Sequence, residues 1–133
     1  MSPARFASAD EIQADLSWTV EPKETMLFRY SALTFNAHAI HLDPQWCREV
    51  EGHRNLLFHG PLSFTLLTLM VENHVKGQGK TLASVGYRNL APLYCSEPVK
   101  LCARESGENK FDIWCETPEG GIAVKGSATV RSA

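Results

Sequence analysis

Four of the five histidines lie in one segment, between Thr34 and Pro61. His38 and His41 are three residues apart, and His59 precedes a glycine and a proline. The segment leads directly into the most apolar part of the chain, Leu62 to Val71. An imidazole exchanges a proton near neutral pH, so histidines grouped beside a buried element are typical of a site for acid/base chemistry. The alternative is a set of ordinary loop or surface side chains.

The element that must position this segment is a helix over residues 61–76. It has a proline at its first position and Gly77 just beyond its end, the asymmetry common in helices. Its apolar residues cover almost every face, which predicts a helix buried by the rest of the chain.

Four later segments are predicted to be strands, and in the last three apolar and polar residues alternate with the period of a half-buried strand. These segments are Leu82–Leu90, Glu97–Glu105, Lys110–Glu116 and Gly121–Arg131. Within the last of them, Gly126 is expected to mark a β-bulge. One helix followed by four strands in a meander predicts an α+β fold, in which an antiparallel sheet curls around a buried helix.

The first third of the chain has a less regular pattern. A capping-box sequence predicts a helical turn over Ala7–Leu16, and Trp18–Glu21 reads as a short extended piece. Residues Glu24–Tyr30 fit either a strand or a short helix. After Asp43-Pro44, which starts a turn, Gln45–Val50 predicts one or two helical turns.

Size and composition predict one domain over residues 1–133. A net charge of −2 gives no reason to expect a nucleic acid or other polyanionic partner. The four cysteines include no C-x-x-C pair, so we expect free, buried thiols and no metal site. The chain has no apolar run of about 18 residues and no signal-peptide pattern at its start, so we expect no membrane association. A cytoplasmic location is predicted, with a mitochondrial one left open.

The segment Phe35–Asp43 resembles the hydratase motif of the MaoC-like, (R)-specific enoyl-CoA hydratases, Gly-Asp-x-Asn-Pro-Ile-His-x-Asp. Ile40, His41 and Asp43 match the end of this motif, and Asn36 stands where the family has an aspartate. The family's downstream His-Gly, which opens its central helix, is retained as His59-Gly60.

The pattern from Ser31 to Asp43 is closer still to one branch of that family. It is similar to the catalytic C-terminal half of the mesaconyl-C4-CoA hydratase and fungal type 2 hydroxyacyl-thioester dehydratase group, over roughly Phe28 to Pro92. The resemblance implies the hotdog fold. Because proteins of this branch often carry two hotdog halves and this chain holds only the motif-bearing half, the resemblance also implies a homodimer.

The implied activity is that of a hydro-lyase. It interconverts 3-hydroxyacyl and trans-2-enoyl thioesters of CoA or a carrier protein, with no cofactor or metal. Hydration needs a base for water, an acid for Cα and a donor to the thioester carbonyl. His41 is the expected acid/base, and the Gly60 N–H at the helix start is the expected donor. The Asn36 amide cannot take a proton, so it can only orient water or substrate.

Several other residues have two open readings. His38, Asp43 or His59 could supply the function that Asn36 lacks, although Asp43 could equally cap the next turn and His59 could fix its loop. Thr65, one turn into the helix, could donate its hydroxyl to the site or pack in the core.

Two arginines and two phenylalanines are candidates for binding the substrate. Arg54 and Arg88 could bind the phosphates of CoA or of a carrier's phosphopantetheine, or be solvated surface groups. Phe35 and Phe58 could form the wall of an acyl pocket or fill the core.

Other functions compete with hydration. Thioesterases of this fold usually place an acidic residue on the central helix, and the only one here, Glu72, comes late in that helix. A secondary-metabolite dehydratase or cyclase, or a non-catalytic acyl-binding subunit, are the remaining alternatives.

Overall fold

The structure, a computed structural model, describes residues 14–34, 42–52, 55–58 and 60–133. Its elements in chain order are β1 (Leu16–Val20), α1 (Glu24–Leu33), α2 (Pro44–Trp46), the π-helical turn η4 (Cys47–Glu51), α3 (Gly60–Lys76), β2 (Lys80–Asn89), β3 (Val99–Gly107), β4 (Lys110–Glu116) and β5 (Ile122–Ser132). The predicted central helix and the four predicted strands after it are confirmed to within two residues at each end.

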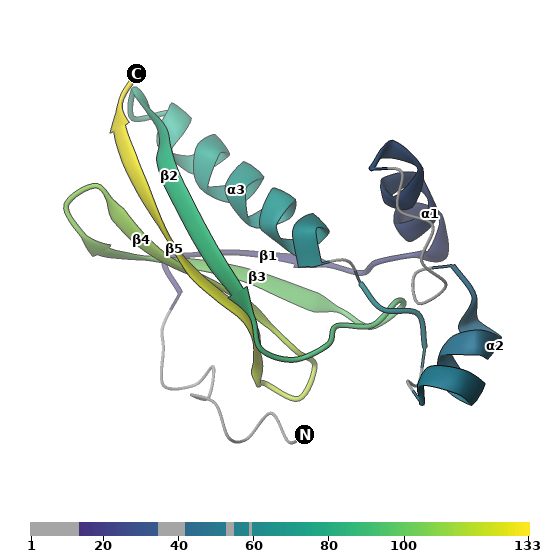
Figure 1. Cartoon of the computed structure of the whole chain (residues 1–133). Helices are drawn as coiled ribbons and strands as arrows, with labels where there is room; N and C mark the ends of the chain where they lie inside the picture. Colours follow the sequence, from purple (N-terminus) through teal and green to yellow (C-terminus); the bar gives the residue numbers. More distant parts are fainter. Residues whose placement is uncertain (1–13, 35–41, 53–54, 59) are drawn as a thin grey trace.

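One antiparallel sheet has the strand order β1-β3-β4-β5-β2, and α3 lies along one of its faces (Figure 1). The meander is confirmed for β3, β4 and β5, but the prediction was wrong for β2, which pairs with β5 at the far edge. The place beside β3 is taken by β1. Residues 90–98 connect β2, at one edge of the sheet, to β3, which lies between β1 and β4.

The core lies between α3 and the sheet. Leu67, Met70, Val71 and Val75 of α3 are at most 1% exposed. They belong to one buried cluster with the inward-facing residues of the sheet, which include Leu101, Ala103, Phe111, Ile113, Cys115, Val124 and Ala128. The apolar residues that alternate along the predicted strands thus face α3 and form the core.

The prediction that α3 is buried on every face was wrong in part, because Leu69 is 54% exposed. A single five-stranded sheet covers one side of a helix and leaves the opposite side open. Among the described residues, the apolar surface of α3 is therefore only partly covered.

Gly126 does not mark a bulge. The register shifts lie between Leu82 and Ser84 and between Cys115 and Glu116, whereas Gly126 pairs in register with Tyr87. A Cβ atom at Gly126 would collide with the carbonyl oxygen of Gly86 and lie 2.9 Å from the Cα of Tyr87. Close approach of β2 and β5 is therefore what requires a glycine here.

The elements before α3 agree with the sequence where the structure describes them. The extended piece is β1, the ambiguous segment is the helix α1, and the expected helical turns are α2 and η4. The turn predicted over Ala7–Leu16 lies mostly outside the described residues, and its last residue begins β1. All four cysteines are free and buried, as predicted. No helix in the described part of the chain is long and apolar enough to span a membrane.

Candidate active site at the start of helix α3

A cavity of about 320 Å³ lies at the start of α3. Its walls come from the segment before the helix, the first helical turn, the connection after β2, and β5. The lining residues are Leu57, Phe58, Ser63, Asn89, Leu90, Ala91, Pro92, Leu93 and Val124. Most of these side chains are apolar, and Ser63 and Asn89 supply polar groups. Such a lining is typical of a small-molecule pocket, in which a few polar groups orient an apolar ligand.

The first residue of α3 is Gly60, which lies in the sequence between Phe58 and Ser63, two residues that line this cavity. The N–H groups of a first helical turn have no partner within the helix, and the helix dipole places a partial positive charge there. Pro61 has no N–H, so Gly60, Leu62 and Ser63 carry the backbone donors of this turn. The start of α3 therefore provides donors suited to an oxygen that gains negative charge.

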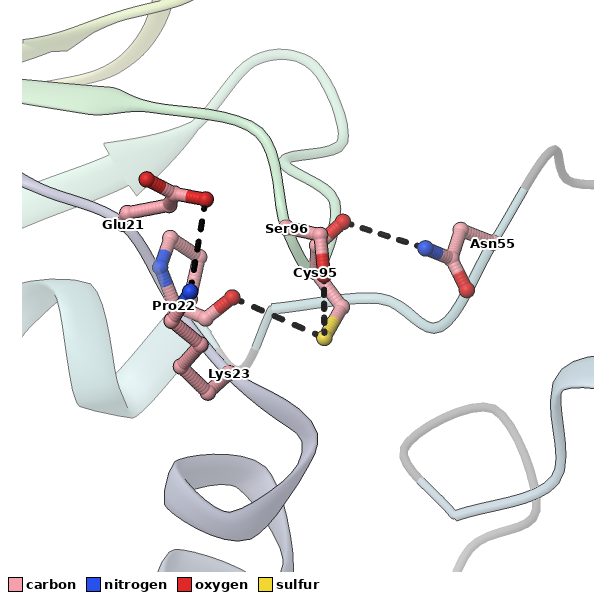
Figure 2. Close-up of polar contacts among 6 residues, drawn as sticks. All are labelled: Glu21, Pro22, Lys23, Asn55, Cys95 and Ser96. Atoms are coloured by element: carbon pink, nitrogen blue, oxygen red, sulfur yellow. Dashed lines mark hydrogen bonds and ion pairs between the residues drawn. The ribbon is translucent and has the colours of Figure 1, made fainter.

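The segment that leads into α3 is held by a short antiparallel pairing with the connection between β2 and β3. Phe58 donates its N–H to the Leu93 carbonyl at 2.7 Å, and Cys95 donates to the Leu56 carbonyl at 2.9 Å. The Asn55 side chain adds two bonds. Its Nδ2 donates to the Cys95 carbonyl at 3.1 Å (Figure 2). Its Oδ1 accepts the Leu56 N–H at 2.8 Å. These bonds determine where the chain enters the helix.

The same connection is also tied to the junction of β1 and α1 (Figure 2). The Pro22 carbonyl accepts the Ser96 N–H at 2.6 Å and the Cys95 thiol at 3.6 Å. Burial raises the pKa of Cys95, so this thiol keeps its proton and remains a donor near neutral pH. Three segments far apart in the sequence are thus joined by hydrogen bonds. The sequence gives no sign of this role for Asn55, because nothing local indicates a partner 40 positions away.

Six of the residues singled out from the sequence lie outside the described residues: Phe35, Asn36, His38, His41, Arg54 and His59. Their predicted roles stay predictions. Of the others, Gly60 begins α3, and Phe58 lines the cavity with 5% of its surface exposed.

Three predicted residues do not line this cavity. Asp43 caps α2, accepting the Trp46 N–H at 3.0 Å, which agrees with the capping alternative. Thr65 donates its hydroxyl to the Pro61 carbonyl at 2.9 Å and is not among the residues that line the cavity. Arg88 is exposed on β2 and lines a different cavity, on the sheet face opposite α3.

Glu72, the candidate acid of the thioesterase alternative, holds α3 to the start of β2. Its two carboxylate oxygens accept the Thr81 hydroxyl at 2.8 Å and the Leu82 N–H at 2.9 Å. These bonds, that to the Leu82 N–H foremost, lower the pKa of the Glu72 carboxyl. The residue lies in the second half of the helix and does not line the cavity at the helix start. Its role in the structure is to connect α3 to the start of β2 by hydrogen bonds.

Two of the buried thiols are poorly suited to nucleophilic chemistry. Burial, together with the hydrogen bond to Glu116, raises the pKa of Cys102 to about 12. Burial likewise raises the pKa of Cys115. Both thiols therefore remain protonated near neutral pH, and the thiolate is the reactive form of cysteine.

Comparisons with known proteins identify the family of the chain and its fold. Residues 2–95 match the family described as hydroxyacyl-thioester dehydratase type 2. The chain is 39% identical over 113 residues to the mesaconyl-C(4)-CoA hydratase of Chloroflexus aurantiacus, a match that covers 85% of the chain and 38% of that protein. It is 34% identical over 100 residues to the mitochondrial hydroxyacyl-thioester dehydratase type 2 of Schizosaccharomyces pombe, covering 75% of the chain and 32% of that protein. The chain thus spans well under half of the length of these relatives.

Among solved structures, the (R)-hydratase from A. caviae involved in PHA biosynthesis superposes with a TM-score of 0.75 at 17% identity, covering 92% of this chain and 98% of that one. An antiparallel sheet with one helix along its face is shared by the two proteins. The hotdog fold is therefore confirmed.

Proposed function

The chain belongs to the hydroxyacyl-thioester dehydratase type 2 family, and we propose that it is a hydro-lyase that interconverts 3-hydroxyacyl and trans-2-enoyl thioesters. The observation that carries this proposal is the start of α3 at Gly60, beside a cavity with mostly apolar walls. An enoyl thioester has an apolar acyl chain and a carbonyl oxygen that gains negative charge during water addition. The cavity and the helix start match these two parts of the substrate.

In the proposed reaction, His41 takes a proton from water as the water oxygen bonds to Cβ. The electron pair of the carbon–carbon double bond moves toward the thioester carbonyl, whose oxygen is stabilised by the Gly60 N–H. The imidazolium of His41 then delivers its proton to Cα, and the carbonyl is restored. Asn36, as an amide, orients the water or the substrate by hydrogen bonds. Dehydration follows the same steps in reverse.

We propose that the acyl chain lies in the cavity at the start of α3. Leu57, Phe58 and Leu93 give it an apolar surface. Phe58 also belongs to the segment whose pairing with residues 93–95 determines where α3 begins. The acyl pocket and the carbonyl donor are therefore positioned by the same set of hydrogen bonds.

We also propose that a second hotdog unit, supplied by a second copy of this chain, completes the protein. Leu69 on the uncovered side of α3 and Phe28 of α1 are 54% and 63% exposed. A second unit packed against this side of α3 would remove the Leu69 side chain from water. Light scattering that gives the mass of a monomer would contradict this part of the proposal.

The test of the activity is a panel of enoyl-CoA and 3-hydroxyacyl-CoA thioesters, followed at the absorbance of the conjugated enoyl thioester. We expect this absorbance to fall with enoyl-CoA and to rise with hydroxyacyl-CoA, with no free thiol produced. Release of free CoA from a saturated acyl-CoA would instead support the thioesterase alternative. No change with any thioester would refute the proposed function.

A further inference from the structure

A basic groove of about 630 Å³ lies on the sheet face opposite α3. We name it the outer groove; it is lined by Gly86, Tyr87, Arg88, Leu90, Asp112, Lys125, Gly126 and Ser127. A smaller cavity of about 230 Å³ adjoins it, shares Asp112 and Lys125 with it, and adds Arg104 and Trp114 to its lining. The two hollows form one continuous surface across β2, β5, β4 and β3.

The centre of the outer groove is a pair of like charges. Arg88 on β2 and Lys125 on β5 are direct cross-strand partners, so their side chains leave the same face of the sheet. The Cβ atoms of such partners are about 5 Å apart, and like charges placed directly opposite one another destabilise a sheet. An anion bound between the two side chains would remove this repulsion.

The protein supplies little negative charge to balance them. The ion pair between Lys23 and Glu21 involves neither of these two cations. Asp112 is the one carboxylate that lines the two hollows, against the three cations Arg88, Arg104 and Lys125. The chain as a whole carries a net charge of −2, so this surface has the opposite sign to the rest of the protein.

The outer groove reaches the candidate active site through Leu90, which lines both the groove and the cavity at the start of α3. This point of contact is well ordered by hydrogen bonds: Leu90 and Ala91 both donate their N–H groups to the Ala123 carbonyl, at 2.7 and 3.1 Å. From Leu90, two residues along an extended strand span about 7 Å to Arg88. An elongated ligand in the cavity can therefore continue past Leu90 to the basic pair.

We propose that Arg88 and Lys125 form a phosphate subsite for the carrier end of the thioester substrate. The inference rests on the proposed function, because a CoA thioester and a carrier-bound thioester both place a phosphate at the far end of a pantetheine arm. Arginine binds phosphate through two parallel N–H bonds, and lysine adds a second point charge. The acyl chain then lies on the α3 side of Leu90 and the phosphate on the outer face.

The test compares three thioesters of the same acyl group: CoA, 4′-phosphopantetheine and pantetheine without phosphate. The variants are Arg88→Gln and Lys125→Gln. The matched control is Lys110→Gln, which removes one positive charge from β4 at a position that lines neither hollow. We expect either test variant to raise KM for CoA thioester about tenfold, the effect of one lost hydrogen bond to a charged group. The pantetheine thioester should show no such rise, and the control should leave KM unchanged with all three substrates.

The pattern of KM changes identifies the source of the phosphate. A rise with both CoA and phosphopantetheine supports binding of the phosphate that the two arms share. A rise with CoA alone supports binding of its nucleotide phosphates. Unchanged KM values in Arg88→Gln and Lys125→Gln, in an enzyme that still hydrates its substrate, would overturn the subsite but not the proposed function.

If the wild-type chain turns over no thioester, the proposed function fails and the subsite is tested by binding alone. Calorimetry with CoA then compares the wild type, the two variants and the Lys110→Gln control. Weaker binding of CoA by the two variants alone supports the subsite, and equal or absent binding throughout overturns it.

Discussion

Asn55→Ala is expected to loosen the entry to α3. The substitution removes two hydrogen bonds, from Asn55 Nδ2 to the Cys95 carbonyl at 3.1 Å and from the Leu56 N–H to Asn55 Oδ1 at 2.8 Å. It also leaves that carbonyl and that N–H without these partners, next to a Leu56 side chain that is 2% exposed. Each such bond contributes about 1 kcal/mol, so the free energy of unfolding should fall by about 2 kcal/mol.

For a domain of this size, that loss corresponds to a Tm lowered by roughly 6–10 °C. Urea unfolding followed by circular dichroism should show a lower midpoint with an unchanged slope, because the area exposed on unfolding stays the same. The matched control is Asn73→Ala, which truncates an exposed asparagine on α3 and should leave the midpoint nearly unchanged. A midpoint for Asn55→Ala equal to that of the wild type would refute the structural role of these bonds.

The same variant links stability to the proposed activity. At 25 °C a loss of about 2 kcal/mol still leaves a domain of ordinary stability folded. A fall in kcat/KM at that temperature would therefore report displacement of the segment before Gly60, and not loss of folded protein. Wild-type kcat/KM in a clearly destabilised variant would show that the start of α3 keeps its position without Asn55.

Three further outcomes follow from the described contacts. Folding lowers the pKa of the Glu72 carboxyl, so its contribution to stability is present above about pH 4.3 and is lost as the pH falls through the folded pKa. Glu72→Gln should therefore lower the urea midpoint at pH 7 and leave it nearly unchanged at a pH below the folded pKa of Glu72. An equal effect at the two pH values would contradict this. Gly126→Ala forces a Cβ against the backbone of β2 and should cost about 1–3 kcal/mol of stability. The control Gly86→Ala, whose Cβ meets nothing within 4 Å, should cost much less. Equal losses of stability in the two variants would refute the close approach of the β2 and β5 backbones at Gly126. A thiol reagent at pH 8 should label Cys102 only as the protein unfolds, because its pKa is raised to about 12, and rapid labelling of the native protein would contradict its burial.

Much of the fold was predictable because its signals are local. Pro61 and Gly77 mark the ends of α3, and alternation along β4 and β5 places one set of side chains inward. Alternation shows which face of a strand is buried, but it does not show which strand lies beside it. The pairing of β2 with β5 depends on where the connection after β2 runs, and no local pattern encodes that path.

The candidate site was predictable only at the positions that belong to a motif. The His-Gly pair placed Gly60 at the start of a helix, and the structure begins α3 there. Asn55 carries no such signal, since its partner Cys95 is distant in sequence and a single asparagine is common in loops. The pairing of Arg88 with Lys125 likewise emerges only from the register of two strands.

The central claim is acid/base hydration by His41, and the decisive measurement is the rate of enoyl-CoA hydration by His41→Ala. The matched control is His74→Ala, which changes an exposed histidine near the other end of α3. Loss of a general acid/base lowers rates by about 100-fold to 10,000-fold. We expect kcat/KM of His41→Ala to fall by at least about 100-fold with an unchanged circular dichroism spectrum, and that of His74→Ala to stay near the wild-type value. Hydration by His41→Ala at the wild-type rate would contradict the account.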